Sequence, residues 1–151
     1  ESTYHNAGHL AIDLLEKTFV VKKVRGFSRN LRNEISKKSK FYFYDLGVRN
    51  AIIGQYNALA LRNDVGFLFE NFIFMELYKK STMFHRHEQF YFWRTHEGAE
   101  MDILVEADGK LRAYECKWSK EKSGNEAKFK SVYQNASVTV VNRENYFDLV
   151  K

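Results

Sequence analysis

The chain has 151 residues, the size of a single domain, and carries a formal net charge of +5. Hydrophobic residues make up 44% and aromatic residues 16%, which is enough for a buried core and excludes an intrinsically disordered chain. No apolar run approaches the roughly 20 residues that span a bilayer, no signal peptide is recognisable, and the single cysteine, Cys116, excludes an internal disulfide. We therefore expect a cytoplasmic protein without a membrane anchor. Because the chain begins with Glu1 rather than methionine, we interpret it as a fragment of a longer protein, and processing of the N-terminus would give the same start.

Residues 1–60 are expected to form a helical and basic extension that packs on the core. Leucines at helical spacing predict a helix from Ala7 to Lys17, and a valine-rich segment predicts a strand from Thr18 to Val24. Further on, Phe41–Tyr44 is expected to be a short aromatic strand, and Leu46–Ile53 a short helix that ends at a glycine.

Basic residues concentrate within this extension. The segment from Lys22 to Lys40 carries a net charge of +7, so the rest of the chain sums to −2. Such a segment is typical of proteins that bind nucleic acids, where basic side chains contact the backbone phosphates without recognising the base sequence. A solvated loop that only keeps the protein soluble explains the charge equally well. The residues expected to contact phosphates are Lys22, Lys23, Arg25, Arg29, Arg32, Lys37 and Lys38.

Residues 61–151 are expected to form the core. Asn63 or Asp64 can cap a helix that runs to about Lys80. Alternation and aromatic content then predict three strands, a helix and a last strand. Their expected bounds are Phe90–Arg94, Met101–Val105, Leu111–Trp118, Asn125–Tyr133 and Ser137–Val141. The fold class is therefore α/β (α+β), with a mixed central sheet flanked by helices.

The second and third of these strands are joined by Asp108-Gly109, a strong hairpin signal because both residues accept positive φ. This turn places Asp102 directly across from Glu115, and Glu100 across from Lys117. Side chains opposed on one face lie about 4.5–5.5 Å apart at Cβ, so the two carboxylates repel each other. A bound Mg²⁺ would remove that repulsion, because it prefers carboxylate oxygens.

A third carboxylate comes from the long helix. Glu70 shares an apolar stripe with Ile73, Phe74 and Leu77, so it must be paired or bound to a ligand. Asn71 lies on another face of the helix and looks ordinary.

These acids also have a plainer explanation. Glu100 with Lys117, and Glu115 with nearby bases, can be cross-strand salt bridges at the surface, which contribute little. Glu70 can pair with an arginine such as Arg94.

Other reactive side chains are interpreted as structural. The Cys116 side chain points away from Glu115 and Lys117, which indicates packing rather than a nucleophile. A zinc site built from His85, His87 and His96 is disfavoured, since no cysteine lies at ligand spacing.

The acids and the lysine together resemble the signature of the PD-(D/E)XK nuclease superfamily, which has an acid on one strand and (Asp or Glu)-x-Lys on the next. Here these are Asp102 and Glu115-Cys116-Lys117, with Met101 in place of the proline. The resemblance implies a restriction-endonuclease-like αβββαβ core, and Glu70 matches an additional helix glutamate common in that superfamily.

A closer resemblance covers most of the chain. Phe41–Gly47, Glu70–Phe72, Gly98–Asp102 and Tyr114–Lys117 are similar to a domain of unknown function, of the 4143 type, that follows the ATPase module of prokaryotic AAA+-like proteins. This implies an N-terminal ATPase partner module outside the chain, which itself holds no Gly-x-x-x-x-Gly-Lys-(Ser/Thr) motif and needs no ATP.

The resemblance implies Mg²⁺ (or Mn²⁺) bound by Asp102, Glu115, Glu70 and the backbone carbonyl of Cys116, with Lys117 positioning the attacking water, and DNA as the expected substrate. A catalytically silent nucleic-acid-binding module and a protein-interaction domain remain alternatives, and so does a homo-oligomer.

Overall fold

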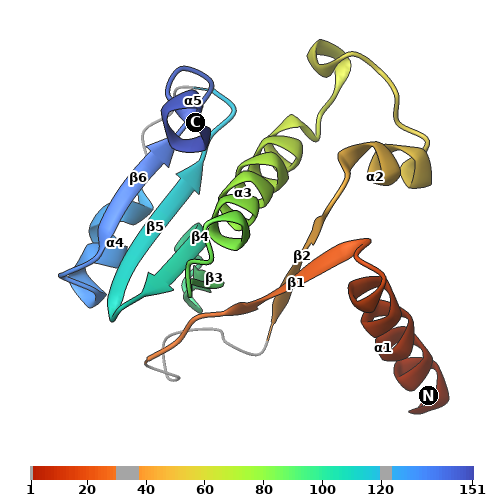
Figure 1. Ribbon diagram of the computed structural model, residues 1–151, viewed down its shortest axis with the longest axis horizontal. Helices are drawn as coiled ribbons and strands as arrows, with labels where there is room; N and C mark the ends of the chain where they lie inside the picture. Colours follow the sequence, from red (N-terminus) through yellow and green to blue (C-terminus); the bar gives the residue numbers. More distant parts are fainter. Residues whose placement is uncertain (1, 30–37, 120–123) are drawn as a thin grey trace.

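A twisted sheet with helices on both faces organises the chain in the computed structural model, which describes residues 2–29, 38–119 and 124–151 (Figure 1). The described residues form six strands in the order β2-β1-β3-β4-β5-β6. The strands are β1 (Val21–Gly26), β2 (Ser39–Phe43), β3 (Gln89–Arg94), β4 (Glu100–Ala107), β5 (Lys110–Cys116) and β6 (Ser137–Val141). The sheet is mixed, because β1 pairs with β3 and β5 with β6 in parallel, while the other neighbours are antiparallel.

The helices divide between the two faces of this sheet. The long helix α3 (Val65–Met83) crosses one face next to the short α5 (Tyr146–Val150), and α4 (Asn125–Val132) covers the other. Helix α1 (Ser2–Lys17) extends away from the sheet beside β1, and α2 (Leu46–Ile53) leads through a 3₁₀ turn, η1 (Leu59–Leu61), into α3. Among the described residues, no helix is both long and apolar enough to cross a membrane.

Strand alternation builds one apolar core on each face. On the α3 face, Ile103 and Tyr114 pack with Ile73 and Phe74 of the helix. On the α4 face, Leu104 packs with other strand residues around Phe129, which is completely buried. Burying aromatic and branched side chains on both faces contributes most of the stability of such a layered fold.

The mixed α/β architecture predicted from the sequence is confirmed. The order α3-β3-β4-β5-α4-β6 follows the predicted order of helix, three strands, helix and strand, with bounds that differ by a few residues. The short elements η1 and α5 were not predicted, because a single turn carries too little periodicity. Strands β1 and β2, from the predicted extension, belong to the same sheet as the core.

The hairpin turn is also confirmed. Asp108 and Gly109 have φ angles of 50° and 72°, as a two-residue turn with positive φ requires, and Ala107 pairs with Lys110. The predicted register continues to the pair of Ile103 and Tyr114.

Beyond that pair, a bulge changes the alternation of β4. Tyr91 pairs with Leu104 but Trp93 pairs with Met101, so β4 has one more residue than β3 in this interval. The side chain of Met101 belongs to the α4 core, whereas that of Ile103 belongs to the α3 core. Asp102, between them, also reaches the α3 side, where it meets residues of β2 and α3. Bulges often redirect a side chain in this way next to functional sites.

Candidate functional site: three carboxylates around Lys40

Three carboxylates converge on one ammonium group beside α3. The Nζ atom of Lys40 lies 2.9 Å from Oε1 of Glu70, 2.7 Å from Oε1 of Glu100 and 3.5 Å from Oδ1 of Asp102. It also lies over the ring of Phe92, 5.5 Å from the centroid. The four charged residues line a cavity of about 410 Å³. Segments far apart in the sequence thus assemble one charged site.

Tyr42 ties this cluster to the core. Its hydroxyl donates to Oε1 of Glu70 at 2.7 Å and lies 3.3 Å from the carbonyl oxygen of Asp102, while its ring stacks on Phe74. Tyr42 and Lys40 are two residues apart in β2, so strand alternation gives them the same face. The edge strand therefore supplies both the cation and a hydrogen-bond donor for Glu70.

Asp102 carries the most unfavourable charge of the cluster. Burial raises the pKa of Asp102 to about 6, and the neighbouring charge of Glu70 adds to this rise, although Lys40 and the amide of Cys116 oppose it. That amide donates to Oδ2 of Asp102 at 2.8 Å. A carboxyl with a raised pKa resists ionisation, which means that the cations present do not fully compensate for its charge.

The two other ionised partners behave differently. Burial alone would lower the pKa of Lys40, but Glu70, Asp102 and Glu100 together raise it above its usual value. Burial would raise the pKa of Glu100, but Lys40 and Arg94, which forms an ion pair with it, lower it instead. Lys40 thus remains positive while three carboxylates face it.

Glu115 and Lys117 lie elsewhere, which corrects the predicted geometry. Leu111 and Ala113 belong to the α4 core and Tyr114 to the α3 core, so alternation along β5 turns Glu115 toward the α4 side. There it is almost completely buried, and its Oε1 lies 3.0 Å from Nζ of Lys117.

The predicted pairing holds from Ala107 and Lys110 as far as Ile103 and Tyr114, but the predicted pair of Asp102 and Glu115 does not follow it. The bulge in β4 places the Asp102 side chain on the face of Cys116 rather than that of Glu115. Sequence reasoning missed this, because it assumed regular alternation on both strands.

The predicted metal ligands are therefore only partly brought together. Among the described residues, no three His, Cys, Asp or Glu side chains are arranged to hold a metal ion, the histidines included. The donor chemistry of the cluster is nevertheless that of a cation site, because carboxylate oxygens of Glu70, Glu100 and Asp102 surround one positive atom. In this arrangement the ammonium of Lys40 occupies the position that a metal cation would take among the three carboxylates.

The basic residues expected to contact phosphate lie on or beside strands β1 and β2, where the structure describes them. Lys22 lies 3.9 Å from Glu16 and over the ring of Tyr78, and Arg29 forms an ion pair with Glu106. Lys23 and Arg25 lie on β1, and Lys38 is exposed just before β2. Arg32 and Lys37 lie outside the described residues.

Asn71 was also underestimated. It is completely buried, its Nδ2 donates to the carbonyl of Phe43 and its Oδ1 accepts from the amide of Phe43, both at 2.8 Å. This amide pair satisfies both polar backbone groups of one residue in the edge strand β2 and fixes β2 on α3. The strand that carries Lys40 and Tyr42 is thereby held against Glu70. The Glu70-Asn71-Phe72 motif was the one signal in the sequence that pointed to it.

Comparison with known proteins identifies the family. Residues 65–148 match a family described as "Domain of unknown function (DUF4143)", and the chain belongs to that family. Residues 5–58 match a second family, "Domain of unknown function (DUF8612)".

Two curated relatives have names that state no function. The chain is 27% identical over 108 residues to the uncharacterized proteins Mb2031c of Mycobacterium bovis and Rv2008c of Mycobacterium tuberculosis. The match covers 70% of this chain but 24% of each relative, so the chain spans about a quarter of their length. No solved structure matches the chain.

Proposed function

We propose that this chain is a restriction-endonuclease-like domain that hydrolyses DNA phosphodiester bonds with Mg²⁺ or Mn²⁺. The observation that carries the proposal is the convergence of Glu70, Glu100 and Asp102 on one cationic atom in a cavity. Three acids with two bases leave one carboxylate uncompensated, and the raised pKa of Asp102 is consistent with this excess. Perturbed carboxyl groups in a cavity are typical of functional sites.

In this proposal Asp102 and Glu70 bind the cation, and Lys40 gives up its contacts with them when the cation enters. When bound, the metal ion would polarise the scissile phosphate and lower the pKa of an attacking water. The ammonium of Lys40, once released, is available to pair with a phosphate oxygen near the cavity mouth. Tyr42 keeps Glu70 oriented through its hydroxyl.

Glu115, Lys117 and the carbonyl of Cys116 enter the proposal through the resemblance to PD-(D/E)XK nucleases. Their link with the acid cluster is the hydrogen bond from the amide of Cys116 to Asp102. Because Glu115 points toward the α4 side, a catalytic role for it requires the end of β5 to change its alternation. Separate variants of the two groups of residues therefore test separate parts of the proposal.

The curated relatives are about four times as long as the matched segment, which leaves room for the ATPase module that the resemblance implies. We propose that such an ATPase module is the partner of this domain, and that the chain itself needs no ATP.

The test is plasmid cleavage by the purified chain with Mg²⁺ or Mn²⁺, with and without a chelator. Asp102→Asn and Glu70→Gln should each reduce cleavage by at least about 100-fold, since each removes a cation ligand. The matched control is Glu76→Gln, because Glu76 lies on the same helix and pairs only with Lys79 at the surface among the contacts described. Cleavage that persists in both cluster variants would rule out this site. Glu115→Gln and Lys117→Met then show whether β5 contributes.

A second function is favoured by one specific observation. Lys40 already joins the three carboxylates, so the cluster can serve as a structural tie without a metal. A catalytically silent module that binds nucleic acid or protein for the ATPase would have this arrangement. It predicts a mobility shift of DNA, or binding of a protein partner, with no cleavage at any divalent-cation concentration.

A further inference from the structure

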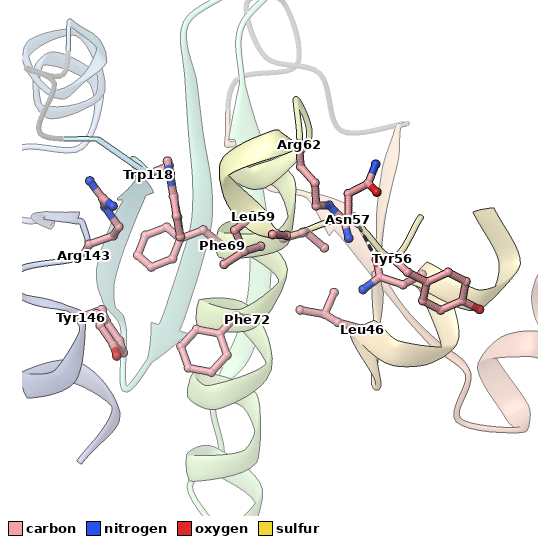
Figure 2. A pocket seen from close by; sticks show the side chains of 13 residues that line it. Leu46, Tyr56, Asn57, Leu59, Arg62, Phe69, Phe72, Trp118, Arg143 and Tyr146 are labelled. Carbon is pink, nitrogen blue, oxygen red and sulfur yellow. Dashed lines mark hydrogen bonds between the residues drawn. The ribbon is translucent and has the colours of Figure 1, made fainter. Parts of the chain in front are cut away.

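A second cavity lies on the α3 side of the molecule and has a different chemistry. It encloses about 730 Å³, the size of a binding pocket. Figure 2 shows Phe69 and Phe72 of α3 between two walls, one with Trp118, Arg143 and Tyr146, the other with residues of α2, η1 and the segment around them. We refer to it as the α3 groove. None of the acids of the Lys40 cluster lines it.

The charge of the α3 groove has one sign. Among the described residues that line it, the charged ones are Arg62 and Arg143. All three nitrogens of the Arg62 guanidinium donate hydrogen bonds, to the carboxylate of Asp64, to Oδ1 of Asn50 at 2.9 Å and to the carbonyl of Gln55 at 3.0 Å. Arg62 thus builds the wall rather than offering donors to a ligand.

The guanidinium of Arg143, unlike that of Arg62, is open to a ligand. It is exposed, its guanidinium lies over the ring of Trp118 at 4.9 Å from the centroid, and no carboxylate in the described part of the chain pairs with it. Its N–H donors remain available for an anionic group at the rim, in the fork geometry that suits a carboxylate.

The apolar surface continues beyond the cavity. Along the wall made by α2, η1 and the residues between them, large apolar side chains are exposed, with Tyr56 at 74%, Leu59 at 50% and Leu61 at 76%. A small polar ligand would leave this surface uncovered, whereas a polypeptide segment with apolar side chains would cover it.

The rings inside the groove also favour apolar side chains over nucleobases. Phe69 meets Trp118 edge-on with an interplanar angle of 73°, Phe72 meets Tyr146 at the same angle, and Arg143 covers one face of Trp118. Such packing leaves few flat ring faces for base stacking, the interaction on which single-stranded nucleic acids depend.

We propose that the α3 groove binds an acidic amphipathic segment of another protein. Apolar side chains of that segment pack against Phe72 and Trp118, which line the groove, and a carboxylate beside them pairs with Arg143. The proposal does not depend on nuclease activity, because the groove and the Lys40 cluster share no residue.

The probe is a fluorescein-labelled helical peptide with leucines along one face and glutamates beside them. Two matched peptides replace the glutamates with lysines or the leucines with serines. Fluorescence anisotropy with the full chain should show binding of the first peptide and at least about tenfold weaker binding of the other two. Arg143→Glu should weaken binding of the acidic peptide about tenfold, since a repulsion replaces an attraction. It should strengthen binding of the lysine peptide, for which an attraction replaces a repulsion. Leu59→Ser should weaken the acidic peptide as well.

The controls separate this surface from general charge effects. Lys110→Glu makes the same reversal at the exposed hairpin, away from the groove, and should leave peptide affinity unchanged. All three changes are at exposed positions, so the unfolding midpoint should stay at the wild-type value.

Three results would overturn the proposal. The first is equal binding of the acidic and lysine peptides. The second is that Arg143→Glu reduces the affinity for a labelled single-stranded oligonucleotide but leaves the affinity for the peptide unchanged. The third is a concentration-dependent mass in light scattering that Leu59→Ser abolishes, because the groove would then be covered by a second copy of the chain.

Discussion

Two clusters of ionised side chains border α3, and their compositions are opposite. Around Lys40, three carboxylates share two cations, since Arg94 also pairs with Glu100. Around Asp64, just before α3, one carboxylate shares two guanidinium groups, with Arg49 at 2.7 Å and Arg62 at 2.8 Å. The first cluster has one negative charge too many, and the second one positive charge too many.

The pKa values follow this difference. Hydrogen bonds from Arg62 and then Arg49, against some desolvation, hold the pKa of Asp64 well below its usual range. Burial, together with Glu70, raises the pKa of Asp102 to about 6. A cluster in which the lone acid is fully satisfied can only hold the fold together. A cluster with an uncompensated acid can hold the fold together and also accept a cation.

The largest loss of stability is expected for Arg62→Met. This change removes the guanidinium from Asp64, from Asn50 and from the carbonyl of Gln55, and it opens the entry to α3. The thermal unfolding midpoint should fall further than for any variant of the Lys40 cluster, and Mn²⁺ should not restore it. A midpoint close to that of the wild type would show that the Asp64 cluster does not stabilise the fold.

Lys40→Met tests the cluster that has an excess of negative charge. It leaves Glu70, Glu100 and Asp102 facing one another with less positive charge, so we expect a loss of about 2–3 kcal/mol in the free energy of unfolding near neutral pH. Because the methionine leaves the carboxylates free to bind a cation, Mn²⁺ should stabilise this variant more than the wild type. Urea unfolding with and without Mn²⁺ measures both effects. Equal responses of the two proteins to Mn²⁺ would contradict a cation site.

These same residues show which features of the fold and the site could be predicted from the sequence. Local rules of alternation and turn chemistry predicted the order of elements along the chain from α3 to β6, the Asp108-Gly109 turn, and the hairpin pairing as far as Ile103 and Tyr114. The convergence of Glu70 and Asp102 was also anticipated, from one apolar helix stripe and one strand.

The parts that could not be predicted depend on irregular or long-range structure. A bulge has no reliable sequence signature, so the separation of Asp102 from Glu115 was not visible. Lys40 was considered only as the end of the basic segment, because nothing local shows that β2 joins the edge of the sheet and turns this side chain inward. The role of Asn71 likewise requires knowing which backbone it meets.

Tyr42→Phe tests how rigidly the acid cluster is held. The change removes a buried hydrogen bond to the carboxylate of Glu70 while the ring remains stacked on Phe74, so we expect a loss of about 1.5 kcal/mol. Tyr56→Phe is the control, because Tyr56 is exposed and its hydroxyl has no role in the cluster. Chemical denaturation of both variants gives the difference, and equal stabilities would show that the hydroxyl contributes nothing to the cluster.

The only gain in stability is expected for Asp102→Asn, and it vanishes at low pH. The native state holds the proton of Asp102 to about pH 6, whereas an unperturbed aspartate releases it near pH 3.8. Between these values the native chain binds more protons than the unfolded chain, so ionisation of Asp102 lowers stability as the pH rises through this window. Below it the carboxyl is neutral in both states, and an asparagine, which can still accept from the amide of Cys116, should be nearly equivalent. The variant should therefore match the wild type near pH 4 and exceed it by about 1–2 kcal/mol at pH 7. Unfolding free energies measured across that range would show the divergence. A variant less stable than the wild type at pH 7 would mean that Lys40 more than compensates for this charge, and the contrast with Asp64 would then disappear.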